Sequence, residues 1–154
     1  MFPIDDLSKR AKDFQKGLST GKFLENILLD NEAYIVNLNA EDQLFDQGIN
    51  ALGVSISDYM PYSPLTIEIK KEKGQPTNRV TLRDEGNFEG SFYVDVGKDS
   101  FEIKAADFKT HDIMTKYGRQ ILGLTDENMQ ELIKEIILPD LIKQRDSLLY
   151  GKKS

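Results

Sequence analysis

The sequence predicts an α+β fold in which helices pack on one face of a small antiparallel β-meander. Apolar residues recur at helical spacing before residue 46 and again after residue 125, whereas residues 80–105 alternate with a period of two. Helical segments that flank a run of short strands are typical of the α+β class. The chain of 154 residues is long enough for one domain: N-terminal helices (1–46), a loop and sheet region (47–124) and a C-terminal helix (125–150).

The N-terminal part predicts a short helix over residues 5–17 and a long helix over residues 20–46. Glycine at position 17 interrupts the pattern, and the hydroxyl of Ser19 or Thr20 can cap the long helix by accepting a bond from a free N–H group. Residues of one apolar stripe follow at spacings of three and four: Leu24, Ile27, Leu28, Tyr34, Ile35 and Leu38.

Residues 64–73 fit both a helix and a strand. Leu65, Ile67 and Ile69 alternate with polar residues, which is strand periodicity. Ser63 followed by Pro64 is a typical helix start, and lysines at positions 70, 71 and 73 favour a helix end. Both interpretations stay open, and the helix signals are slightly stronger.

The stretch VTLRDEGNFEGSFYVDVG, residues 80–97, begins the meander. Three strands are predicted, joined by a corner at Gly86 and by a tight turn between Gly97 and Ser100. Their apolar positions are Val80 and Leu82, then Phe88, Phe92 and Val94, then Phe101 and Ile103.

The C-terminal helix has a clear start and an interruption. Thr125 is a candidate N-cap, followed by two acidic residues that suit the positive end of a helix. Pro139 has no N–H to donate, so the helix is predicted to kink there.

Composition argues against several function classes. Cysteine is absent and histidine occurs once, so thiolate chemistry is excluded and an enzyme becomes less probable. The net charge is −6, and residues 1–62 hold five Lys/Arg against ten Asp/Glu. A basic stripe for DNA is therefore not expected. The N-terminus lacks signal-peptide character and no apolar run has membrane-spanning length, so we expect synthesis in the cytoplasm and no membrane partner.

Chemical motifs are weak. Asp84 and Glu85 are adjacent and splay apart on a strand or turn, so they do not form the close pair that acid–base catalysis needs. With Asp95 and Asp99 they could supply oxygen ligands for Mg²⁺ or Ca²⁺, but the spacing does not match the EF-hand pattern. His111 lies beside Asp112 without a nucleophile motif. We therefore expect no catalytic residue, no metal site and no cofactor.

The order of motifs in the second half of the chain resembles a known family. The matching residues are Pro64, Thr66, Lys70, Leu82, Gly86, Phe88, Ser91, Phe92, Tyr117, Gly118 and the run Ile121, Leu122, Gly123, Leu124, Thr125, Asp126 and Glu127. Together they resemble the phage virion-morphogenesis family of Mu-like tail-completion proteins, and the related head–tail joining and neck proteins. The resemblance covers residues 45–138. Glu85 is a departure, because the family usually has Thr before the glycine of this turn.

The resemblance implies a non-enzymatic structural protein of a phage or prophage, which completes the tail or joins it to the head. Such a protein would move from the host cytoplasm into the virion, and its partners would be other tail or connector proteins and copies of itself, arranged as a ring. The open edge of the meander is one candidate contact. The candidate interaction residues are Gly86, Phe88, Ser91, Phe92, Tyr93, Tyr117, Gly118, Leu122 and Gly123.

Two other functions remain as alternatives. One is a metal-dependent hydrolase that uses Asp84, Glu85 and Asp95, which requires tight divalent-cation binding. The other is a tail-assembly chaperone or regulatory binding protein, which would be absent from mature particles.

Overall fold

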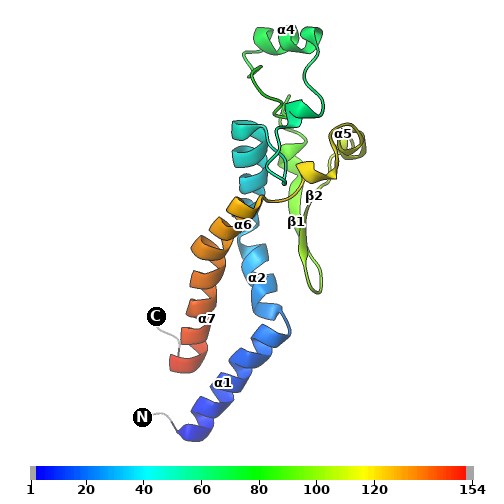
Figure 1. The fold of residues 1–154 in the computed structure, drawn as a ribbon. Helices are drawn as coiled ribbons and strands as arrows, with labels where there is room; N and C mark the ends of the chain where they lie inside the picture. Colours follow the sequence, from blue (N-terminus) through cyan, green and yellow to red (C-terminus); the bar gives the residue numbers. More distant parts are fainter. Residues whose placement is uncertain (1–2, 152–154) are drawn as a thin grey trace.

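A helical arm and a head that holds most of the chain make up the molecule (Figure 1). The computed structural model describes residues 3–151. The arm contains α1 (Ile4–Ser19), α2 (Lys22–Asp30) and, running in the opposite direction, α7 (Leu138–Tyr150). Helix α1 begins and α7 ends at the same end of the molecule, and the two helices pack together there.

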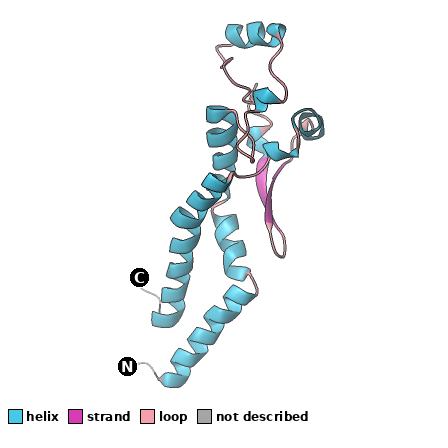
Figure 2. Ribbon diagram, viewed as in Figure 1, coloured by secondary structure: helices cyan, strands magenta, loops and turns pink. Residues whose placement is uncertain are grey.

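The head contains one hairpin and several short helices (Figure 2). Its elements are α3 (Glu32–Asn37), the π-helical segment η1 (Leu38–Gln47), η2 (Ile56–Asp58), α4 (Pro64–Glu72), η3 (Glu89–Ser91), β1 (Phe92–Val96), β2 (Phe101–Ala105), α5 (Thr110–Tyr117) and η4 (Arg119–Ile121). The chain returns toward the arm through α6 (Asp126–Leu132) and the π-helical segment η5 (Ile133–Ile137).

The α+β prediction is confirmed, but the sheet has two strands within the described residues. Strands β1 and β2 pair in antiparallel fashion, with Val94 opposite Ile103. Gly97 N–H donates to the Ser100 carbonyl at 2.7 Å, which closes the predicted turn. Helices α2 and α3 pack against β1. The third strand, predicted around Val80 and Leu82, is wrong: that segment is irregular.

The first N-terminal helix is slightly longer than predicted, and the long helix predicted over residues 20–46 is broken into α2, α3 and η1. Gly21 adopts φ 73° and separates α1 from α2, and a further turn at Asn31 separates α2 from α3. The predicted hydroxyl N-cap is wrong, because Ser19 and Thr20 both donate back to the Lys16 carbonyl of α1. The kink at Pro139 is confirmed as a bend: η5 ends two residues before this proline.

The hydrophobic core lies in the head and where the arm joins it. Its buried members are Leu28, Ile35, Leu38, Ala40, Leu44, Ile56, Val80, Phe88, Phe92, Val94, Ile103, Ile121 and Leu132. None of them comes from α1 or α7, and no residue of either helix is buried. No described helix is both long and apolar enough to cross a bilayer.

Candidate functional site

Helix α4 forms because its start is well capped. The Ser63 hydroxyl accepts a hydrogen bond from Thr66 N–H at 3.2 Å, and Pro64 occupies the first turn, where a missing N–H costs nothing. The helical interpretation of residues 64–73 is therefore correct. Its C-terminal turn carries Lys70 inward, and this lysine is the buried residue of the helix.

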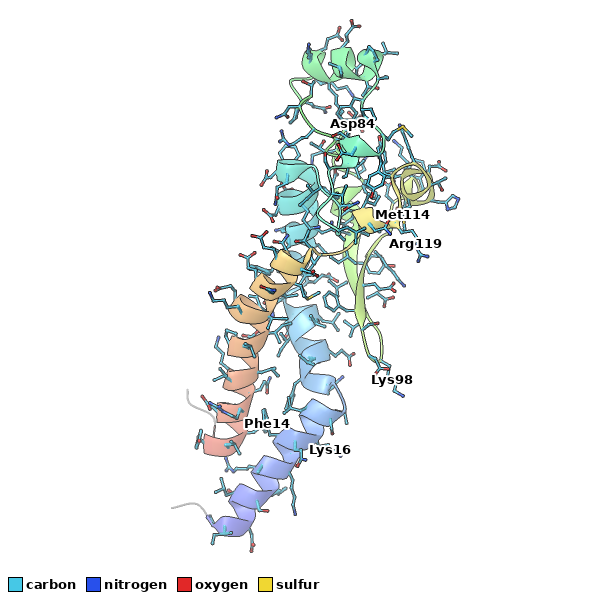
Figure 3. All side chains as sticks on the ribbon, in the orientation of Figure 1. Phe14, Lys16, Asp84, Lys98, Met114 and Arg119 are labelled. Carbon is cyan, nitrogen blue, oxygen red and sulfur yellow. The ribbon has the colours of Figure 1, made fainter. Side chains whose placement is uncertain are left out.

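A hollow of about 440 Å³ lies between α4, α5 and the irregular segment 82–84; we call it the α4 pocket. Its walls are largely apolar or aromatic: Met60, Pro61, Tyr62, Ile69, Leu82, Ile113 and Tyr117. Its charged lining residues are Lys70, Lys73, Arg83, Asp84 and Lys116. Four cations thus face one carboxylate in a protein whose net charge is −6. Figure 3 places Asp84 in the head below α4.

Lys70 is 8% exposed and has only neutral partners. Its Nζ donates to the Arg83 carbonyl at 3.0 Å and to Gln75 Oε1 at 3.3 Å. It also lies 5.0 Å from the centroid of the Tyr62 ring. None of the ion pairs among the described residues includes this ammonium. The carboxylate of the pocket whose pKa this charge helps to lower is Asp84, which Lys73 already pairs with, so the pocket keeps a net positive charge.

The other cations of the pocket are already engaged. Lys73 donates to Asp84 at 2.8 Å, and this hydrogen bond is the largest cause that holds the pKa of Asp84 below its usual value. Arg83 pairs with Glu41 at 2.6 Å and with Glu89 at 3.5 Å. Lys116 lies 5.1 Å from the ring centroid of Tyr117 and is exposed.

Side chains supply the hydrogen bonds that a third strand would otherwise make. Thr81 N–H donates to the Tyr62 hydroxyl at 3.1 Å, and the Arg83 carbonyl accepts from Lys70. Leu82 between them adopts φ 61°, which is rare for a residue with a side chain and costs free energy. These bonds explain why alternation at Val80 and Leu82 did not produce a strand.

The nine candidate interaction residues fall into four groups. Phe88 and Phe92 are buried and pack edge to face with ring centroids 5.0 Å apart, so they belong to the core. Gly86 and Gly118 shape the backbone at φ 88° and φ 93°. Ser91 stabilises the turn before β1, because its hydroxyl donates to the Phe88 carbonyl at 2.7 Å.

The remaining four line surface hollows. Tyr117 lines the α4 pocket, whereas Tyr93, Leu122 and Gly123 line a second hollow of about 450 Å³ beside β2. Figure 3 labels two residues of this second hollow, Met114 and Arg119. The structure thus separates these residues instead of joining them in one site.

The acidic residues of the hydrolase alternative are not assembled. Asp84 and Glu85 are exposed at the turn, and Asp95 lies on β1, where it pairs with Lys104. The described part of the chain holds no group of three His, Cys, Asp or Glu residues that could bind a metal ion. His111 is exposed on α5.

Lys70 is the functional candidate that sequence reasoning missed. It was interpreted only as a cation at a helix end, because a lysine is usually exposed. Its apolar neighbours gave no signal of this burial, because Leu65 and Ile69 are themselves exposed in α4. Its neutral partners, Gln75 and Arg83, could not be identified without the fold.

Comparison with known proteins gives no relative: no protein family, no curated protein and no solved structure matches the chain.

Proposed function

We propose that the protein is a non-enzymatic structural component of a phage or prophage particle, which acts in tail completion or head–tail joining through contacts with other copies and with tail or connector proteins. The observation that supports this proposal is the large solvent-accessible surface area of the chain. The chain exposes 10228 Å². A compact monomer of 17.5 kDa would expose about 7,900 Å², so this chain exposes roughly 30% more.

Part of this surface is an apolar stripe on α1, formed by Ile4, Leu7, Ala11 and Leu18. These positions are spaced by three, four and seven residues, as on one face of a helix. Ile4 is 84% exposed, Leu7 44% and Leu18 40%. Helix α7 packs on α1, yet these side chains remain exposed. An amphipathic helix with its apolar face in water favours association with a second surface.

A second copy of the chain is the occupant that the proposal commits to. The excess of roughly 2,300 Å² exceeds the ~800 Å² that each partner buries in a standard interface. Helix α7 offers further apolar side chains at Leu138 and Ile142, both about half exposed. The edge of β2 is a second candidate contact for a ring, since a two-stranded sheet leaves unpaired backbone groups.

The phage setting rests on the resemblance over residues 45–138. Two features of that motif order have a structural role in this chain: Gly86 adopts the positive φ of the turn, and Thr125 caps α6. Both support the alignment of motifs on which the proposal depends.

Self-association is tested by sedimentation velocity over a range of concentrations. We expect the wild type to form oligomers and the double variant Leu7→Gln, Leu18→Gln to shift toward monomer. The control is Lys9→Gln, Lys16→Gln, which changes the other face of the same helix. A wild-type chain that stays monomeric at every concentration would contradict the proposal.

Presence in the mature particle is tested by mass spectrometry of purified virions. A structural component is present at fixed stoichiometry in mature particles. An assembly chaperone is found only in lysates of assembling cells, and that result would favour the alternative function.

A further inference from the structure

We propose that the α4 pocket binds a carboxylate carried on an apolar group, with the Lys70 ammonium as its charge partner. The ligand is a polypeptide C-terminus with an apolar last residue or a free aliphatic acid, which share this chemistry. The inference does not depend on self-association, because no residue of α1 lines the pocket.

The first argument is the hydrogen-bond capacity of Lys70. An ammonium has three donors, and two of them have oxygen acceptors, on Arg83 and Gln75. The Tyr62 ring supplies a partial negative charge, which is weaker than that of an anion. An anion in the pocket would accept the third bond and balance the buried charge.

The second argument is that the ammonium is fixed in place before any ligand arrives. Gln75 connects Lys70 to the turn, since its Nε2 donates to the Asp84 carbonyl at 2.9 Å. The strained φ of Leu82 sets the backbone just before Arg83, whose carbonyl holds Lys70. A side chain that is held by its surroundings loses little entropy when a ligand binds.

The third argument is the chemistry of the walls. The pocket of about 440 Å³ has the size of a small-molecule site and is mostly apolar, with few polar groups. Lys116 adds an exposed cation at the pocket, and Lys73 already neutralises Asp84. One buried ammonium in an apolar hollow suits a monoanion with an apolar stem. Inorganic phosphate would need more donors than Lys70 offers.

The experiment is calorimetric titration of the full chain with matched probes. N-acetyl-alanyl-leucine is compared with its C-terminal amide, and octanoate is compared with octanamide. Inorganic phosphate serves as an anion that has no apolar group. We expect an acid to bind about tenfold or more tightly than its amide, the effect of one charge-assisted hydrogen bond. If the peptide acid is the tighter ligand, the source is a polypeptide C-terminus; if octanoate is tighter, it is a free acid.

Two variants locate the interaction. Lys70→Met keeps the apolar stem and removes the charge, so affinity for the acid should fall about tenfold or more to that of the amide. Lys71→Met, on the exposed side of the same helix, should leave it unchanged. If Lys70→Met does not fold, the comparison of acid with amide on the wild type, with displacement of the Tyr62 and Tyr117 ring signals in NMR spectra, decides the matter.

Equal affinity for acid and amide, binding of phosphate as tight as that of the acids, or no binding of any acid would overturn the proposal. The proposed assembly function would survive each of these results, because its test is sedimentation. Conversely, a monomeric chain that binds the acid would remove only the assembly function.

Discussion

At the scale of single residues, three buried amides, those of Asn39, Gln43 and Asn128, join η1 to the segment that leads from η4 into α6. Asn39 donates to the Ile121 carbonyl at 3.0 Å and accepts from Gly123 N–H at 2.9 Å. Gln43 donates to the Gly123 carbonyl and accepts from Thr125 N–H and from Asn128, all within 2.9 Å. A fully satisfied buried network of this kind fixes one arrangement of the chain.

Asn39→Ala should therefore lower the free energy of unfolding by about 2–4 kcal/mol, because it leaves the Ile121 carbonyl and the Gly123 N–H buried without partners. Urea denaturation followed by circular dichroism measures the change. Asn37→Ala, an exposed asparagine two residues earlier, should change stability by less than about 0.5 kcal/mol. Equal effects of the two substitutions would show that the network contributes nothing specific.

Glu89 is a second residue whose surroundings matter, because they shift the pKa of its carboxyl group. It is buried beside Arg83, and neither carboxylate oxygen accepts a hydrogen bond from another described residue. Burial raises the pKa of Glu89 above its ordinary value of 4.5, although the charge of Arg83 opposes the shift.

A raised pKa means that the folded state binds more protons than the unfolded state in the window above pH 4.5. The free energy of unfolding therefore falls as the pH rises through this window. Glu89→Gln removes this pH dependence. The free energy of unfolding of the variant, relative to that of the wild type, should therefore rise between pH 4.5 and neutrality. Denaturation at a series of pH values tests the prediction, and a stability difference that is constant with pH would contradict it.

At the scale of elements, the predicted caps at Ser63 and Thr125 are confirmed, whereas the one at Ser19 or Thr20 is wrong. Thr125 accepts from Asn128 N–H at 3.2 Å, as its position before two acids predicts, and Ser63 does the same for α4. These interactions are local, since donor and acceptor lie three residues apart in the sequence.

Thr125→Ala should lower the free energy of unfolding by about 1 kcal/mol, because an N–H group of the first turn loses its acceptor. Thr125→Ser keeps the hydroxyl and should retain most of the stability. The same denaturation experiment measures both. A serine variant as unstable as the alanine variant would assign the effect to packing of the threonine methyl group.

Strand prediction failed where alternation was the only signal. Residues 65–69 alternate but lie in α4, because the cap at Ser63 and the proline that follows it determine the local structure. Val80 and Leu82 alternate as well, yet Tyr62 and Lys70 take the backbone bonds of this segment. Where a tight turn supported the alternation, as at Gly97, the predicted hairpin formed.

At the scale of the whole molecule, the helical arm extends away from the head (Figure 1). Both ends of the described chain lie at the tip of an arm that contributes no buried residue from α1 or α7 (Figure 1). The head holds the core, and the arm presents apolar side chains to solvent. This exposed apolar surface is the feature on which the proposed assembly function rests.

Small-angle scattering of a dilute monomer should give a radius of gyration well above the ~15 Å that a compact chain of this length has. The arm is the cause, since it extends α1 and α7 away from the head. A lysozyme-sized globular protein measured in the same buffer is the control. A value near ~15 Å would mean that the arm folds back on the head, and the surface argument for assembly would fail.

The sequence by itself determined the fold class, the helix caps at Ser63 and Thr125, the hairpin turn and the bend at Pro139, because these depend on contacts within a few residues. Only the tertiary structure decided that Lys70 is buried with neutral hydrogen-bond partners, and that Phe88 and Phe92, which the sequence offered both as apolar strand positions and as interaction candidates, belong to the core. Burial depends on what distant segments place around a side chain. The uncovered stripe on α1 follows the same rule: the sequence shows that the helix is amphipathic, and the fold shows that α7 leaves its apolar face in water.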